Sequence, residues 1–147
     1  MSEISGRERN VDATAVLAKI DDVIEDVDWH IYDGLLVTHS VPADQKIYLV
    51  LQGELRHVPN LRTFNNLFKS PTVSINDYLV DRCPRGTALS DGAVIVIAGA
   101  LNQFIITDGV KMLIPDPATR DKFQLRIDPV IVPDIMLEFI PKGPDIG

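Results

Sequence analysis

The sequence predicts a mainly β, α+β fold with two duplicated β-hairpin units and short helices, preceded by one N-terminal amphipathic helix. The first observation is an internal repeat, because YLVLQGELRHVPNLRT at 48–63 returns as FIITDGVKMLIPDPAT at 104–119. The second is a change of hydrophobic period near Trp29, from that of a helix to the period of two that is typical of strands. Three identities fix the repeat at a spacing of 56 residues: Gly53 with Gly109, Pro59 with Pro115 and Thr63 with Thr119.

The N-terminal segment is expected to contain a flexible stretch over 1–9 and a helix over 10–28. Its apolar residues recur at the i, i+3, i+4, i+7 spacing of one helical face, opposite a strongly acidic face. This stripe either packs on the β core or pairs with another subunit. The stripe comprises Ala13, Val16, Leu17, Ile20, Val23, Ile24 and Val27, of which Val16, Ile20, Val23 and Ile24 are the candidate interface residues.

Short stretches rich in β-branched residues alternate with Gly, Pro and Asp after Trp29, as expected for strands. The predicted strands are GLLVTHS, KIYLVL, ELRHV, AVIVIAG, QFIIT, VKMLI and IMLEFI. Asp108-Gly109 is a strong two-residue hairpin turn, and Gln52-Gly53 is its counterpart in the first copy. A two-residue turn fixes the cross-strand partners. The predicted pairs are Val50 with Leu55, Tyr48 with His57, Leu49 with Arg56 and Ile47 with Val58.

The chain is expected to form one domain over 1–147, with a first unit at 33–85, a second at 91–125 and a C-terminal edge segment at 126–147. Short helices are predicted in NLRTFNNLF and in SINDYLV, where Ser74 and Asp77 have the spacing of a capping box. Prolines in IDPVIVPDIMLEFIPKGP argue against a central strand there, so this segment is expected at a sheet edge or on the surface.

These stretches resemble a bacterial repeat of surface-associated and cell-wall-hydrolase-linked proteins. Its pattern is a short helix ending in Pro-x-Gly, then Asp-Gly-x-Leu, then Tyr-Leu-Ile-x-x-Gly-x-x-Arg-x-Ile-Pro-x-x-x-Thr-Phe. The matching segments, within about 33–124, are DGLLV, IYLVLQGELRHVPNLRTFNNLF, DYLVDRCPRGTALSDGAVIV and QFIITDGVKMLIPDPAT. The second copy departs from the pattern at Met112 and Arg120. The resemblance implies an accessory, non-catalytic module with a binding or scaffolding role.

Composition narrows the classes of partner. The chain has 147 residues, 46% of them hydrophobic, and a net charge of −7 without a basic stripe, so no nucleic-acid partner is expected. The start MSEISGRERN has no apolar signal core, and no apolar run reaches the length of a membrane span. The chain is therefore expected to be cytoplasmic, or exported without a classical signal peptide.

No complete catalytic or metal-binding motif occurs, so the sequence predicts no enzyme, metal or cofactor. Cys83 and His57 lack a local nucleophile motif, and the histidines lack the spacing of metal ligands. The predicted function is a non-enzymatic binding module with glycan or cell-envelope material as the candidate ligand. The alternative is a structural or interaction subunit of a homo- or hetero-oligomeric assembly. The candidate ligand-binding residues are Trp29, Tyr32, Tyr78, Arg56 and His57, with core packing as the alternative for the aromatic ones.

Overall fold

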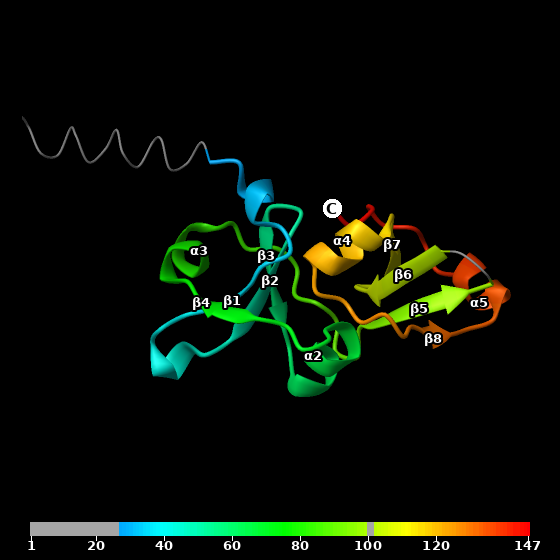
Figure 1. Ribbon diagram of the computed structural model, residues 1–147, viewed down its shortest axis with the longest axis horizontal. Helices are drawn as coiled ribbons and strands as arrows, with labels where there is room; N and C mark the ends of the chain where they lie inside the picture. The colour runs from blue at the N-terminus through cyan, green and yellow to red at the C-terminus, as the bar shows by residue number, and fades with distance from the viewer. Residues whose placement is uncertain (1–26, 100–101) are drawn as a thin grey trace, which may run out of the picture.

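A computed structural model of the chain describes residues 27–99 and 102–147. These residues form two four-stranded sheets with short helices, which Figure 1 shows side by side. The structure confirms the predicted mainly β, α+β class and the two duplicated sheet units. Most of the helix predicted over 10–28 lies outside the described residues, which begin at residue 27. The same holds for its candidate interface residues, Val16, Ile20, Val23 and Ile24.

The first sheet has the strand order β3-β2-β1-β4. Its strands are β1 (Leu36–Thr38), β2 (Ile47–Leu51), β3 (Glu54–Val58) and β4 (Val73–Ile75). Strands β1, β2 and β3 are antiparallel neighbours, whereas β4 pairs parallel to β1. The predicted hairpin register is confirmed, since Tyr48 pairs with His57 and Val50 pairs with Leu55.

The second sheet repeats this topology in the order β7-β6-β5-β8. Its strands are β5 (Val94–Ala98), β6 (Asn102–Thr107), β7 (Val110–Ile114) and β8 (Val130–Ile131), and β8 again pairs parallel to the first strand of its unit. Both hairpins turn where predicted. Gln52 and Gly53 have φ of 55° and 72°, and Asp108 and Gly109 have 53° and 72°, as a two-residue type I′ turn requires.

Each hairpin is followed by a helix with the same cap. The helices are α2 (Leu61–Leu67) and α4 (Pro117–Lys122). Asn60 Oδ1 accepts a hydrogen bond from Thr63 N at 2.9 Å, and Asp116 Oδ1 accepts one from Thr119 N at 2.7 Å. The repeated threonine therefore marks the N3 position of a helix whose N-cap side chain accepts its amide hydrogen.

Two local predictions are wrong. In SINDYLV the helix α3 covers Asp77–Arg82, and its N-cap is Asn76, whose Oδ1 accepts from Leu79 N at 3.0 Å. Ser74 lies in β4 instead of capping the helix. The stretch IMLEFI is a helix, α5 (Asp134–Glu138), and not a strand. Within the same tail, β8 is the last strand of its sheet.

The duplication extends beyond the hairpins. Helices α3 and α5 follow the parallel strands β4 and β8, and each is followed by a Pro-x-Gly segment that pairs with the hairpin. Leu55 N donates to Pro84 O at 2.8 Å and its carbonyl accepts from Gly86 N at 2.9 Å. Lys111 makes the same two bonds with Pro141 and Gly143, both at 2.9 Å. The C-terminal segment therefore belongs to the second sheet.

One hydrophobic cluster joins the two units. It contains Leu36, Leu49 and Val58 from the first sheet together with Ile95, Ile105 and Ile114 at the matching positions of the second. The segments that follow α2 and α4 also pair with each other in an antiparallel bridge between Phe68 and Leu125. On either side of the bridge, Arg126 N donates to Leu67 O at 2.8 Å and Lys69 N donates to Gln124 O at 3.2 Å. The two units consequently share a core.

A second cluster lies on the other side of the first sheet. It is built from Val37, Tyr48, Val50 and Leu55 of the sheet and from Leu79, Val80 and Cys83 of the α3 region. A 3₁₀ helix, η1 (Trp29–Tyr32), packs against it through Trp29 and Tyr32. We call this side the outer face of the first sheet, and the matching side of the second sheet is its outer face.

Candidate functional site

Three of the predicted ligand-binding aromatics lie together on the outer face of the first sheet. The ring centroids of Trp29 and Tyr32 are 6.0 Å apart, and those of Trp29 and Tyr78 are 5.8 Å apart. Trp29 and Tyr32 are half-buried against the cluster beneath them. The three rings therefore form a cover over the sheet, with Tyr78 at its exposed margin.

The other two predicted residues, His57 and Arg56, are neighbours on β3 and point to opposite faces of the sheet. His57 packs on Tyr48 with ring centroids 5.7 Å apart. Burial, and then the charge of Lys46, lower the pKa of His57, so the imidazole is neutral at pH 7. Arg56 Nη2 donates to Gln52 Oε1 and to Glu54 Oε1, both at 3.1 Å. The structure does not bring Arg56 and His57 into one site.

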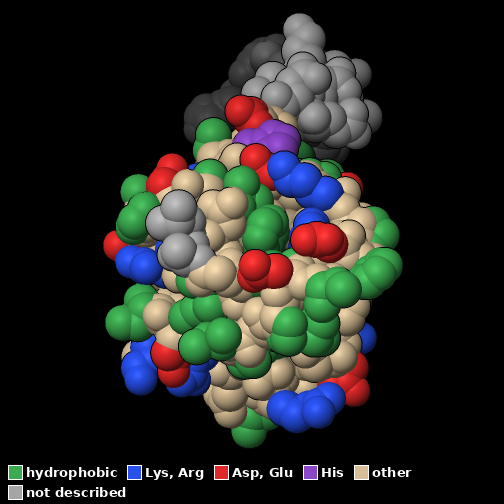
Figure 2. All heavy atoms as spheres, turned by 90° about the vertical axis from the view of Figure 1, so that its right-hand side faces the viewer, with side chains coloured by type: hydrophobic (Ala, Val, Ile, Leu, Met, Phe, Trp, Pro, Cys, Tyr) green, Lys and Arg blue, Asp and Glu red, His purple; other side chains and the backbone are tan. Residues whose placement is uncertain are grey.

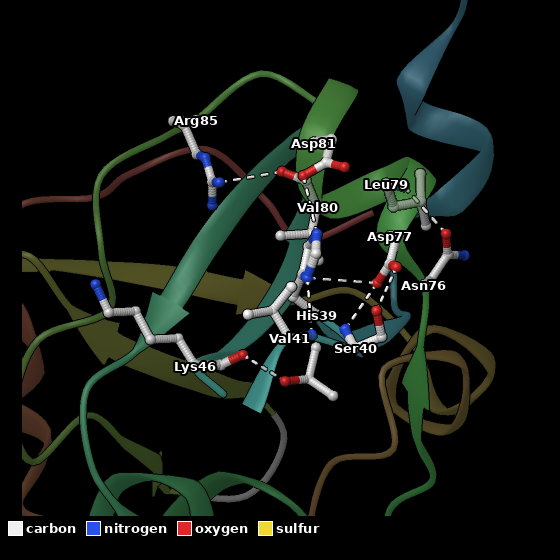
Figure 3. A network of polar contacts seen from close by, with 11 residues as sticks. His39, Ser40, Val41, Lys46, Asn76, Asp77, Leu79, Val80, Asp81 and Arg85 are labelled. Carbon is white, nitrogen blue, oxygen red and sulfur yellow. Dashed lines mark hydrogen bonds and ion pairs between the residues drawn. The ribbon is translucent and has the colours of Figure 1, made fainter. Parts of the chain in front are cut away.

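A polar network attaches the loop after β1 to α3 (Figure 3). Ser40 donates to Asp77 through its amide at 2.7 Å and through its hydroxyl at 2.5 Å, and these bonds lower the pKa of Asp77. His39 Nδ1 accepts from Val41 N at 3.0 Å, which leaves Nε2 to donate to Asp81 Oδ1 at 3.1 Å. Because the Ser40 hydroxyl donates to a carboxylate and not to an imidazole, this network positions a loop and does not activate a nucleophile.

Cys83 is a packing residue. It is buried, and its Sγ donates to Gly53 O at 3.6 Å. Burial, with a smaller contribution from the Asp33 carboxylate, raises the pKa of the thiol to about 11. A thiol with this pKa is a poor nucleophile at neutral pH.

Within 27–99 and 102–147, no three His, Cys, Asp or Glu side chains gather in a way that could bind a metal ion. The helices of the same residues are all too short or too polar to cross a membrane.

Each unit has a pocket between the open end of its hairpin and the helix that follows. The first pocket has a volume of about 370 Å³ and the second of about 140 Å³. Their linings correspond position by position along the repeat. The matching pairs are Lys46/Asn102, Ile47/Gln103, Val58/Ile114, Pro59/Pro115, Leu61/Pro117 and Phe64/Arg120.

The outer part of the second unit exposes several large apolar side chains on β8 and α5 and at the residue after α5. We call these residues the β8–α5 surface: Val130, Ile131, Ile135, Met136 and Phe139. Figure 2 views this end of the molecule, where hydrophobic side chains lie between scattered charged ones. Met136 is 52% exposed, whereas Leu79, at the matching position of α3, is 0% exposed. The same helix position is thus covered in one unit and open in the other.

No protein-family model matches the chain, and no curated protein is similar to it. Among solved structures, the chain is similar to one from the periplasmic assembly of the ESX-5 inner membrane complex, with a TM-score of 0.32 and 13% sequence identity. The match covers 77% of this chain and 46% of that chain, so this chain spans less than half of its length. A TM-score of this size supports no conclusion about fold or function.

Sequence reasoning missed both pockets and the β8–α5 surface. One signal of the pockets was present, because Arg120 stands where the first copy has Phe64. The exposure of α5 had no comparable signal, since its residues were assigned to a strand.

Proposed function

We propose that this chain is a non-enzymatic binding module that assembles with another protein through the β8–α5 surface of its second unit. The observation that carries this proposal is the 52% exposure of Met136 at a position where the first unit buries Leu79. Folded monomers rarely expose contiguous apolar patches, and those that do usually use them for binding.

The difference between the units has an identifiable cause. In the first unit, Trp29 and Tyr32 pack over the outer face beside α3. The matching turns are identified by their hydrogen bonds, Leu35 N to Tyr32 O at 3.1 Å and Ala93 N to Ser90 O at 3.0 Å. The second unit therefore has Ser90 in place of Tyr32, and its residues 87–90 form no counterpart of the 3₁₀ helix that carries Trp29. The small Ser90 side chain cannot replace the aromatic cover.

The chemistry of the surface favours a protein partner over a glycan. Glycan sites use exposed ring faces, but Trp29 and Tyr32 are half-buried and pack against each other with their planes tilted by 41°. The β8–α5 surface instead presents aliphatic side chains with Met136 and Phe139. Methionine and aromatic residues are enriched in the cores of protein interfaces. The resemblance of the repeat to accessory bacterial modules agrees with such a role and stays a prediction.

The test compares two variants of the full chain. Met136→Lys with Phe139→Lys places two charges on the β8–α5 surface, while Ile75→Lys changes a matched side chain that is 70% exposed on β4 of the first unit. In sedimentation velocity over a wide concentration range, the double variant is expected to lose the association that the wild-type chain and Ile75→Lys retain. This outcome identifies a second copy of the chain as the partner.

If the wild-type chain is monomeric throughout, a photo-crosslinking residue at position 139 is compared with one at position 75 in cells that make the protein. A discrete crosslinked protein at 139 that is absent at 75 supports a different protein partner. A monomer that yields the same crosslinks from both positions contradicts the proposal.

A further inference from the structure

We propose that the pocket of the first unit binds a small molecule with an apolar body and a carboxylate head group. This site is distinct from the β8–α5 surface, and the inference goes beyond the proposed function. It rests on the lining of the pocket, on the charges at its rim and on the contrast with the matching pocket of the second unit.

The body of the pocket is apolar. Its volume of about 370 Å³ falls in the range of roughly 300–1,000 Å³ that is typical of small-molecule sites. Ile47, Val58 and Phe64 line it, and the Phe64 ring packs on Phe68 at a centroid distance of 5.4 Å. Leu61, also in the lining, is 73% exposed and has apolar surface that a ligand would remove from water.

The rim of the pocket selects the sign of the head group. Lys46 and His57 are the ionisable residues among those that line it. Burial and the charge of Lys46 lower the pKa of His57, so His57 offers a neutral hydrogen-bonding group. The positive charge at the rim is that of Lys46. Asn60, also in the lining, donates through Nδ2 to the Asp91 carboxylate at 2.8 Å, and Arg62 Nη2 pairs with the same carboxylate at 2.8 Å. The rim therefore complements an anion.

The second unit shows that the fold does not require this lining. At its matching pocket the wall residues stay apolar, with Ile114 and Pro115 in place of Val58 and Pro59. The positions that set the chemistry differ, because Gln103 and Arg120 replace Ile47 and Phe64. Gln103 Oε1 and Arg120 Nε are shielded from solvent without a hydrogen-bond partner among the described residues. An apolar ligand would fit the first pocket and not the second.

The experiment uses decanoate as the probe, with decanol and decylamine as arms that change only the head group. Isothermal titration of the full chain is expected to give a Kd for decanoate on the order of 10⁻⁴ M, from the usual efficiency of small ligands. Decylamine is expected to bind at least about tenfold more weakly, since it would meet Lys46 at close range. Lys46→Met should weaken the binding of decanoate by about the same factor and leave the affinity for decanol unchanged.

The duplication supplies a matched control. Ile47→Gln with Phe64→Arg gives the first pocket the side chains that the second unit has at these positions, and it should abolish binding. Gln103→Ile with Arg120→Phe makes the reverse change in the second unit and should leave the decanoate affinity of the first pocket as it was. If the first double variant does not fold, as judged by thermal unfolding, Leu61→Asp alters the mouth of the pocket at an exposed site and should give the same loss.

Each alternative outcome overturns the inference. Equal affinities for the three probes would show that the rim does not select an anion. Binding that survives the Ile47/Phe64 variant, or Leu61→Asp, would place the probe elsewhere. Loss of binding in the Met136→Lys, Phe139→Lys variant would assign the probe to the β8–α5 surface, and no binding at all would refute the site. None of these results affects the proposed protein partner, which is tested by sedimentation and crosslinking.

Discussion

Replacing Phe123 with alanine tests whether the two units fold as one. Phe123 is fully buried in the cluster that joins the sheets, directly after α4 of the second unit. Removal of its ring loses about 2–3 kcal/mol of transfer free energy. A cavity of roughly 80–100 Å³ would add about 2 kcal/mol, less any collapse, so we expect a total loss of about 4 kcal/mol.

The assay uses Trp29, the single tryptophan, which lies in the first unit on the outer face of its sheet. Urea unfolding is followed both by Trp29 fluorescence and by far-UV circular dichroism. With an m-value of about 2 kcal/mol/M, the loss of about 4 kcal/mol would lower both midpoints by about 2 M. The expected result is a shift of the Trp29 transition caused by a substitution in the other unit.

The control is Ile75→Ala, at a residue that is 70% exposed and lies outside the β8–α5 surface, which should change the free energy of unfolding by less than about 0.5 kcal/mol. A Trp29 midpoint that stays in place while the circular dichroism curve becomes biphasic would refute the reasoning. Such a result would mean that the units unfold independently and that the common cluster contributes little to their coupling.

Two further predictions concern single residues of the hairpins and of α3. Gly109→Val should destabilise the chain by about 1–2 kcal/mol, because Gly109 has φ of +72° and no neighbour lies within 4 Å of an added Cβ, so backbone strain alone acts. Gly109→Asn should lose less stability than Gly109→Val. Equal unfolding temperatures for the wild type and both variants would contradict the assigned turn. Burial raises the pKa of the Cys83 thiol to about 11. Its reaction with a disulfide reagent at pH 8 should therefore be roughly 100-fold slower in the folded chain than in the urea-unfolded chain. Rapid modification of the folded chain would show an accessible thiolate and contradict this prediction.

The strands could be predicted because two local signals determine them together. Alternating side chains fix which residues share a face, and a two-residue turn fixes which residues oppose each other. Tyr48 and His57 therefore pair as predicted. The repeat supplied independent support, since a turn with Gly53 recurs at Gly109 with the same positive φ values.

The errors arise where long-range pairing decides between local alternatives. Ser74, Asn76 and Asp77 are all acceptable near a helix N-terminus, but pairing of Val37 with Ser74 takes Ser74 into β4 and leaves Asn76 as the cap. The six apolar and acidic residues of IMLEFI fit a strand or a helix equally well, because periodicity cannot separate the two over so short a run. There Pro133 forms the N-cap, and the helix begins at Asp134.

The pockets and the β8–α5 surface could not be predicted because their properties depend on which segments cover them. Phe64 lines a cavity only because α2 packs against the end of its hairpin. Met136 is exposed where the matching Leu79 is buried, and the second unit has no counterpart of the 3₁₀ helix that packs Trp29 and Tyr32 on the first sheet. Both facts need the positions of residues distant in sequence.

The duplication separates what the fold requires from what it leaves open. Where both units need the same packing, the chemistry is kept, as at Leu49 and Ile105 in the common cluster. Met136 differs from Leu79 in exposure, and Arg120 differs from Phe64 in polarity, although their backbone positions match. Since the same supersecondary arrangement accommodates either side chain, folding alone explains neither choice. These positions are therefore where binding is best sought, and where exchanging residues between the units should alter function with little loss of stability.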